Sequence, residues 1–318
     1  MILSVSRRTD IPAFFSEWFY KRISEGFYMV RNPMNTRQIS KVNIKPDVVD
    51  CIVFWTKNPK PMLARLNELE AYKYYFQYTI TGYGKEMEPH VPDLHELIET
   101  FQNLSDKIGQ DRVIWRYDPI IFSYEYTTEY HLKRFKEVAE QLKGFTKKCV
   151  ISFVDIYTSK NMSNMNDIHY KEISNDAINQ FAKSLAEIAK DNGMVVGTCA
   201  EKIDLSFCGI EHNSCIDKNL IESIIGYELK VGPDGQRSEC RCVKCDEMGA
   251  FDTCLHGCKY CYANYREAVV RENARKYDIS SPILCGTVSQ KVGDKITERP
   301  VKSYKTEKQM EQLTFKFD

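Results

Sequence analysis

The sequence predicts an α/β fold in residues 1–200, followed by a cysteine-rich region in residues 201–318. Short runs of β-branched and aromatic residues alternate with amphipathic helical patterns through the first two-thirds of the chain. Six such pairs in series predict a parallel sheet with right-handed crossover connections. Because six units are too few for a complete eight-stranded barrel, the pattern leaves a partial (β/α)6 barrel of parallel strands or an open doubly wound sheet.

The predicted strands are apolar runs with the composition of parallel strands buried on both faces. They are expected at residues 2–6, 48–55, 74–81, 112–115 with the residues that follow, 149–154 and 194–197. The helices between them have readable ends. Asp10 can cap a helix that has Pro12 in its first turn and apolar positions at Phe15, Trp18, Phe19 and Ile23. Further helical stripes lie within residues 94–104, 132–142 and 178–189.

Bulk composition excludes few classes of function. Lysine plus arginine equals aspartate plus glutamate at 44 each, so the net charge gives no argument for a nucleic-acid partner. The first residues contain too short an apolar run for a signal peptide, so we expect a cytoplasmic protein with no membrane partner. In a reducing compartment the 12 cysteines are expected to serve as metal ligands rather than disulfides. Cys51, Cys149 and Cys285 lie in apolar runs and are expected to be buried, inert thiols.

Three cysteines near the C-terminus, Cys254, Cys258 and Cys261, have the spacing C-x3-C-x2-C. Three thiolates can hold three irons of a 4Fe–4S cube and leave the fourth iron open to another ligand. The alternative is a closed structural zinc site completed by His256 or a fourth cysteine. Zinc sites of that kind usually pair two C-x2-C knuckles, and this stretch has one.

A second group of cysteines precedes this motif and indicates a further metal site. Its members could hold a second iron–sulfur cluster, a zinc ion or a soft substrate such as trivalent arsenic. The order of preference for its ligands is Cys199, Cys215, Cys240 and Cys242, followed by Cys245 and Cys208.

Polar residues follow the predicted strands, where active sites of βα barrels lie. The candidates for catalysis through cofactor and substrate contacts are Arg7, Arg8, Lys57, Arg116 and Asp155, and Asp10 and Glu201 are candidates for cofactor binding. Since a charge within a β-run is costly to bury unless it is paired, ion pairs such as Arg116–Asp118 or Arg8–Asp10 are an equally good explanation for any one of them.

The cysteine spacing, with the aromatic Tyr260 before the last cysteine, resembles the cluster loop of the radical S-adenosylmethionine superfamily. The resemblance implies a partial barrel, a 4Fe–4S cluster whose open iron binds S-adenosylmethionine, and a position for Tyr260 near the adenine. In that superfamily the loop usually follows the first strand, whereas here it lies near the C-terminus. Because the first and sixth strands of a barrel are near neighbours, a loop after the sixth strand is expected to reach the same mouth.

The resemblance extends over nearly the whole chain. The stretches SRRTDIPAF, VFWTKNPKP, TGYG, WRYDPI, ISFVDIY and TCLHGCKYCYAN resemble a bacterial family of unknown function that has a C-terminal cluster of the radical S-adenosylmethionine type. Cys242-Val243-Lys244-Cys245 is similar to part of the cysteine motif of arsinothricin-pathway enzymes, which transfer a 3-amino-3-carboxypropyl group. Residues 312–315, QLTF, resemble the short peptide by which DNA-processing proteins bind the sliding clamp.

These features predict an iron–sulfur enzyme that reductively cleaves S-adenosylmethionine to start radical chemistry on an unidentified substrate. Its electron donor is expected to be a reductase, a flavodoxin or a ferredoxin. Three alternatives remain at this point: a 3-amino-3-carboxypropyl transferase, a nucleic-acid repair enzyme with a clamp-binding tail, and a non-enzymatic zinc module.

Overall fold

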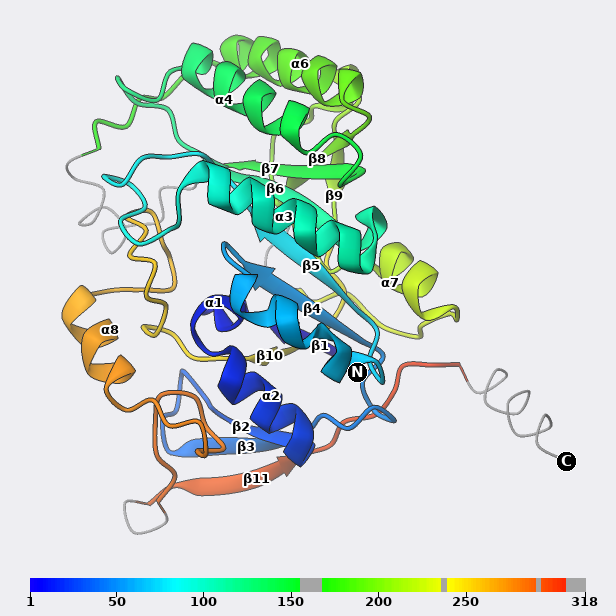
Figure 1. The fold of residues 1–318 in the computed structure, drawn as a ribbon, viewed down its shortest axis with the longest axis vertical. Helices are drawn as coiled ribbons and strands as arrows, with labels where there is room; N and C mark the ends of the chain where they lie inside the picture. The colour runs from blue at the N-terminus through cyan, green and yellow to red at the C-terminus, as the bar shows by residue number, and fades with distance from the viewer. Residues whose placement is uncertain (155–167, 236–238, 290–292, 307–318) are drawn as a thin grey trace, which may run out of the picture.

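The computed structural model describes residues 1–154, 168–235, 239–289 and 293–306. It contains an eight-stranded sheet, in which all neighbouring strands are parallel, and a separate three-stranded sheet (Figure 1). The order of the large sheet is β10-β1-β4-β5-β6-β7-β8-β9. Its strands are β1 (Ile2–Val5), β4 (Cys51–Thr56), β5 (Tyr74–Thr79), β6 (Val113–Ile120), β7 (Lys148–Phe153), β8 (Val195–Cys199), β9 (Glu211–Asn213) and β10 (Asp246–Met248).

All six predicted strands are confirmed, as β1, β4, β5, β6, β7 and β8, and they lie side by side in chain order. The sequence did not predict β9 and β10, two three-residue strands that extend the sheet at its two edges. One prediction was wrong: the cysteine loop does not follow the sixth strand. It follows β10, which pairs with β1 in parallel register, and the sixth strand, β8, lies at the other side of the sheet beside β9.

The crossover helices cover one face of the large sheet. They are α3 (Leu94–Ile108), α4 (Thr128–Gln141) and α6 (Asn175–Asp191), which lie together beside the strands in Figure 1. Right-handed crossovers between strands that are neighbours in chain order all return on the same side, so one face receives the helices. The buried cluster on this face joins Phe101, Phe135 and Leu185 of the helices to alternate strand residues such as Phe54 and Trp115.

The other face of the sheet is covered by the cysteine-rich segment. Here a second buried cluster joins the intervening strand residues Val53, Tyr75 and Ile114 to Cys215 and Cys242. The helix α7 (Lys218–Ile225) contributes to the same cluster. Because no crossover helix is available for this face, apolar residues within 215–231 and 240–245 supply its cover.

The smaller sheet was not predicted and lies at the opposite end of the molecule from α4 and α6 (Figure 1). Its order is β11-β3-β2, formed by β2 (Phe27–Arg31), β3 (Gln38–Asn43) and β11 (Lys295–Arg299). It joins the N-terminal hairpin to the far end of the chain, since β11 pairs with β3 in parallel register. A further helix, α8 (Glu267–Ala274), follows the cysteine loop. Among the described residues, no helix has the length and apolar content needed to cross a bilayer.

The first helix is divided in two, contrary to the single helix expected. α1 (Ile11–Phe14) ends at Phe15, and α2 (Ser16–Glu25) begins directly after it. The predicted cap is confirmed, because the Asp10 carboxylate accepts the backbone N–H of Ala13 at 3.0 Å. The short 3-10 segments are η1 (Lys60–Leu69), η2 (Gln110–Arg112) and η3 (Ser206–Cys208).

The buried His131 predicts a loss of stability in mild acid. Its side chain in α4 is fully buried between the Tyr117 hydroxyl, 2.8 Å from Nδ1, and the Ile121 carbonyl, 3.0 Å from Nε2. Burial lowers its pKa to about 4, below the value of about 6.5 expected in the unfolded chain. The stabilising contribution is therefore complete above pH 6.5 and is lost as the pH falls toward 4, by about 3 kcal/mol in all.

Denaturant unfolding between pH 7.5 and pH 4 measures this loss. The His131→Gln variant cannot gain this proton, so its free energy of unfolding should fall less steeply over the same range. An equal slope in the variant and the wild-type protein would assign the acid sensitivity to other groups.

Candidate functional site

Most of the predicted site residues meet in one pocket of about 350 Å³ at the carboxyl ends of the strands of the large sheet. The predicted residues that line it are Arg7, Arg8, Asp10, Lys57, Arg116, Cys199, Cys215, Cys240, Cys242, Cys254, Cys258, Tyr260 and Cys261. Glu201 does not line it; its carboxylate accepts the backbone N–H of Phe153 at 2.8 Å. Asp155 lies outside the described residues.

The cysteine loop is held over β1 and β4 by the carboxylate of Asp10. Oδ1 accepts the Thr56 hydroxyl at 2.8 Å as well as the helix-capping N–H, and Oδ2 accepts the backbone N–H of Lys57 at 2.7 Å. Oδ2 also accepts His256 Nε2 at 2.8 Å, from inside the C-x3-C-x2-C motif. With four donors to one carboxylate that is 4% exposed, Asp10 fixes the position of the loop relative to the sheet.

A buried ion pair holds the other side of the loop. Lys57 Nζ lies 2.8 Å from Glu88 Oε1, which also accepts the Thr81 hydroxyl at 2.7 Å and the Tyr260 hydroxyl. Burial alone would raise the pKa of Glu88, but Lys57 and the two hydroxyl donors lower it below its usual value. Glu88 is not predictable from the sequence, because it lies in the irregular segment after β5 and no motif spacing includes it.

Backbone contacts complete the docking of the loop onto residues 84–91. The N–H of His90 donates to the carbonyl of His256 at 3.1 Å, and the N–H of Lys259 donates to the carbonyl of Met87 at 3.0 Å. Gly257 between them has a φ of +70°, and a Cβ there would lie 3.3 Å from the His90 ring. Glycine is therefore required at this position both by the backbone and by the close approach.

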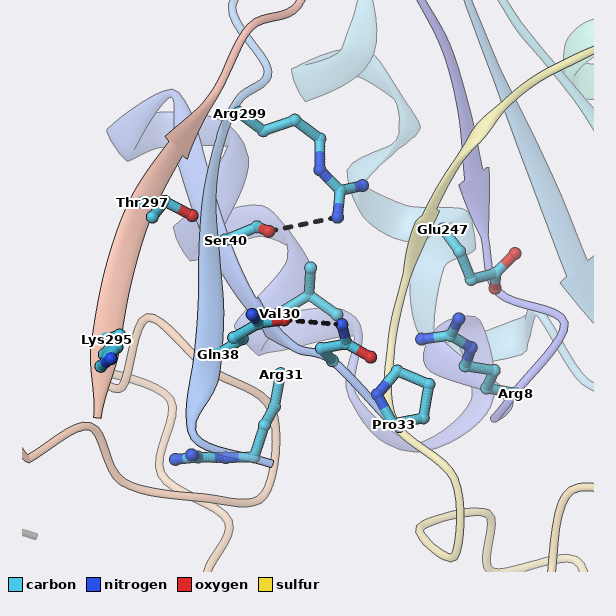
Figure 2. Close-up of a pocket in the computed structure, with 11 residues that line it drawn as sticks. Arg8, Val30, Arg31, Pro33, Gln38, Ser40, Glu247, Lys295, Thr297 and Arg299 are labelled. Atoms are coloured by element: carbon cyan, nitrogen blue, oxygen red, sulfur yellow. Dashed lines mark hydrogen bonds between the residues drawn. The ribbon is translucent and has the colours of Figure 1, made fainter. Parts of the chain in front are cut away.

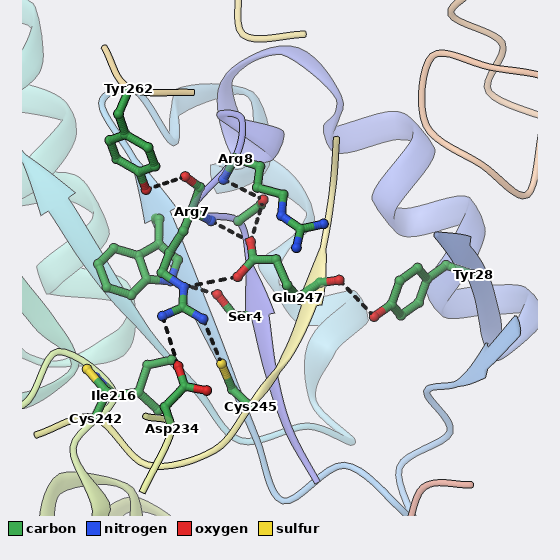
Figure 3. Close-up of polar contacts among 12 residues, drawn as sticks. Ser4, Arg7, Arg8, Tyr28, Ile216, Asp234, Cys242, Cys245, Glu247 and Tyr262 are labelled. Atoms are coloured by element: carbon green, nitrogen blue, oxygen red, sulfur yellow. Dashed lines mark hydrogen bonds and ion pairs between the residues drawn. The ribbon is translucent and has the colours of Figure 1, made fainter. Parts of the chain in front are cut away.

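Arg7 joins the end of β1 to β10 and to the cysteine-rich segment (Figure 3). Its guanidinium donates to Glu247 at 3.1 Å, to Asp234 at 3.2 Å and to Cys245 Sγ at 3.1 Å. Its carbonyl accepts the Tyr262 hydroxyl at 2.6 Å, just beyond the cysteine motif. These contacts make Arg7 a positioning residue for both cysteine segments.

The half-buried cysteines Cys254, Cys258 and Cys261 line the pocket together. Burial raises the pKa of all three, and the positive charge of Lys57 acts in the opposite direction on Cys258 and Cys261. The backbone N–H of Ala263 donates to Cys261 Sγ at 3.4 Å. Three soft sulfurs with an N–H donor and a nearby cation form a donor set that suits a thiophilic metal centre.

Within the described part of the chain, no three His, Cys, Asp or Glu side chains are close enough to surround one metal ion. A cube-shaped cluster does not require such convergence, because each cysteine thiolate binds a different iron. His256, which could have completed a zinc site, directs Nε2 to Asp10, while its Nδ1 is buried without a partner among the described residues.

The second cysteine group lies around Arg116, which reaches the pocket from β6. Its guanidinium donates to Cys215 Sγ at 2.9 Å and to Gln77 Oε1 at 3.3 Å, and it forms an ion pair with Asp118. The Arg116–Asp118 pair anticipated from sequence is thus present. Cys215 Sγ in turn lies 3.1 Å from Cys199 Sγ, and a hydrogen bond from Cys242 lowers the pKa of Cys240 to about 7.

A second cavity of about 420 Å³ lies between the small sheet and β10 (Figure 2). Its charged lining residues are Arg8, Arg31, Lys295, Arg299 and Glu247. Arg31 pairs with Asp294 at 2.7 Å and Arg299 pairs with Asp246 at 2.8 Å. Arg8, which lies 5.0 Å from the Phe251 ring, lines both cavities and therefore connects the basic cavity to the cysteine pocket.

Comparison with known proteins identifies a family. The model of a domain of unknown function, DUF1848, matches residues 2–263. The chain belongs to this family. Its match spans the large sheet and the C-x3-C-x2-C motif, so both belong to the family's domain. The family has no known function, and no curated protein matches the chain.

In this DUF1848 protein, we expect a conservative substitution of Glu88 in the Lys57–Glu88 ion pair to lower the stability strongly. Glu88→Gln leaves the Lys57 ammonium buried without its counter-ion, which should lower the free energy of unfolding by about 3–5 kcal/mol. Glu96→Gln removes an exposed partner of Lys60 and is the matched control, with no measurable change expected. Chemical denaturation of both variants measures the difference, and equal stabilities would contradict a docking role for Glu88.

Proposed function

We propose that this protein is a radical S-adenosylmethionine-type iron–sulfur enzyme. In this proposal Cys254, Cys258 and Cys261 hold a 4Fe–4S cluster, and reductive cleavage of S-adenosylmethionine starts radical chemistry on a substrate in the adjoining pocket. The observation that carries the proposal is that the three thiols, from the far end of the chain, line one pocket with the polar residues at the ends of the parallel strands.

Two features of the chain support three-cysteine ligation. The motif supplies three thiols, one for each of three irons of a cube, which leaves the fourth iron without a cysteine ligand from the loop. The pocket also has mixed apolar and polar walls, which suits a bound cofactor that must be kept from bulk water. When bound, the cluster and S-adenosylmethionine supply low-potential electron transfer and a reactive radical.

The protein's own contribution is placement and charge. Lys57 provides a buried positive charge beside Cys258 and Cys261, and Glu88 holds both Lys57 and Tyr260 in place. Tyr260 is proposed to lie against the adenine of the cofactor. Arg8, Arg116 and Asp155 remain proposed contacts for cofactor or substrate, whereas Glu201 lies outside the pocket lining and binds the backbone of Phe153.

The strand order supports a partial barrel over an open doubly wound sheet. Six strands adjacent in chain order, with their crossover helices on one face, give no reversal of strand order such as a doubly wound sheet has. We therefore assign residues 1–200 to a partial (β/α)6 barrel and residues 201–318 to a cysteine-rich region that packs on its mouth.

Cleavage of S-adenosylmethionine by anaerobically purified protein tests the proposal. After reconstitution with iron and sulfide and reduction with dithionite, we expect cluster iron and release of 5′-deoxyadenosine. Cys258→Ala should abolish the product and lower the bound iron, because it removes a cluster ligand. Cys285→Ala is the matched control, since this buried thiol lies outside the pocket, and it should keep both.

The identity of the released nucleoside separates the proposed reaction from its closest alternative. Methylthioadenosine in place of 5′-deoxyadenosine would indicate transfer of a 3-amino-3-carboxypropyl group. Tightly bound zinc, with no iron and intact S-adenosylmethionine, would contradict the enzyme and indicate a structural metal module.

The basic cavity favours a second candidate function, repair of a nucleic acid. Arg8 and Lys295 face this cavity, and phosphate groups of a bound strand could occupy it while a base reaches the cysteine pocket past Arg8. The proposed clamp-binding residues 312–315 lie outside the described residues.

Salt-dependent binding of a short single-stranded DNA tests this candidate. Lys295→Gln should weaken binding and reduce the slope of log affinity against log salt by about 1, because one phosphate contact is lost. Lys276→Gln on the surface beyond α8 is the control and should leave the slope unchanged. No binding at low salt would contradict a nucleic-acid substrate.

A further inference from the structure

The second cysteine group is assembled from three separate parts of the chain. Cys199 ends β8, Cys215 follows β9, and Cys240 and Cys242 come from the segment before β10. All four line the same pocket as the cluster loop. Three segments that are distant in the sequence therefore contribute thiols to one site.

The contacts among these thiols differ from those of cysteines that merely pack. Cys199 Sγ and Cys215 Sγ lie 3.1 Å apart, and Cys240 and Cys242 line the same pocket. By contrast, the buried thiols of Cys51 and Cys149 lie within strands and contact the carbonyl of the next residue, at 3.7 Å and 4.0 Å. Two of the four thiols are therefore in direct sulfur contact, and the other two line the same pocket.

Hydrogen-bond donors and a cation also converge on this group. The backbone N–H of Ile216 donates to Cys242 Sγ at 3.3 Å, and Asn213 Nδ2 donates to Cys215 Sγ at 3.8 Å. Arg116, which is 5% exposed, donates to Cys215 Sγ at 2.9 Å. N–H donors and a buried guanidinium stabilise sulfur that carries negative charge, as sulfur does when it binds a metal.

We propose that Cys199, Cys215, Cys240 and Cys242 form a second, thiolate-ligated metal centre, separate from the cluster loop. The occupant is a thiophilic centre, either one zinc ion or an iron–sulfur cluster. Four cysteines complete its ligand shell, so it has no open position for S-adenosylmethionine. Among the described residues no three of these side chains surround a common point, so the thiols must move into a shell when the metal enters, with sulfur atoms about 3.8 Å apart around a tetrahedral zinc ion.

Metal content of a full-length variant that lacks the loop ligands isolates this centre. Cys254→Ala, Cys258→Ala and Cys261→Ala are combined, and the protein is purified anaerobically. Separate samples are supplied with zinc alone and with iron plus sulfide, and bound metal and sulfide are counted. We expect about one zinc per chain, or about four irons with sulfide, and the sample that retains its metal against a chelator identifies the occupant.

Adding Cys215→Ser and Cys242→Ser to that variant should remove the metal, whereas adding Cys285→Ala should not. The thermal unfolding midpoint of each variant without metal shows whether the chain is folded, and the single change Cys199→Ser offers a milder test if the double change unfolds it. No bound metal in the first variant, metal retained after the Cys215 and Cys242 changes, or a Cys199–Cys215 disulfide in anaerobic protein would overturn the proposal.

The proposal of a second metal centre and the proposed function can be contradicted independently of each other. A chain with Cys215→Ser and Cys242→Ser but an intact loop still reports iron binding at Cys254, Cys258 and Cys261. Loss of metal from the second group alone would thus leave the loop's cluster in place, and absence of iron from the loop would leave the second centre measurable.

Discussion

The carboxylate of Asp10 is the interaction on which the site depends. It accepts hydrogen bonds from α1, from the end of β4 and from His256, a residue 246 positions away in the chain. It thereby ties the cysteine loop to the end of β4 and to the helix that follows β1. The Lys57–Glu88 pair adds a second anchor with the same effect, since it binds Tyr260 of the loop to β4 and to the segment after β5.

The sheet's topology explains why the cysteine-rich segment has its position. With the crossover helices on one face, the opposite face of the strands needs an apolar cover, and residues within 215–231 and 240–245 provide it. The same segment carries Cys215, Cys240 and Cys242 to the strand ends, while β10 places the loop beside β1. The segment that covers the sheet therefore also assembles the pocket. A substitution that weakens the packing of this segment on the sheet should affect both cysteine groups.

The sequence predicted the elements with strong patterns and missed those without them. The six long strands and the α6 stripe were found because apolar periodicity defines them. β9 and β10 have three residues each, too few for a pattern, and β11 is exposed along its whole length. Asp10 was recognised as a helix cap, but its bond to His256 depends on tertiary contact. Glu88 carried no signal, because its importance comes only from Lys57 and Tyr260 meeting it.

The most direct test of the central claim is electron paramagnetic resonance of the reduced, reconstituted protein with and without S-adenosylmethionine. If Cys254, Cys258 and Cys261 hold a cluster with an open iron, the signal of the reduced cluster should change when S-adenosylmethionine is added. The change should be absent in Cys258→Ala and present in Cys285→Ala. If S-adenosylmethionine leaves unaltered the part of the 4Fe–4S signal that Cys258→Ala removes, that result contradicts the account, since the cluster of the loop would then offer no iron to the cofactor.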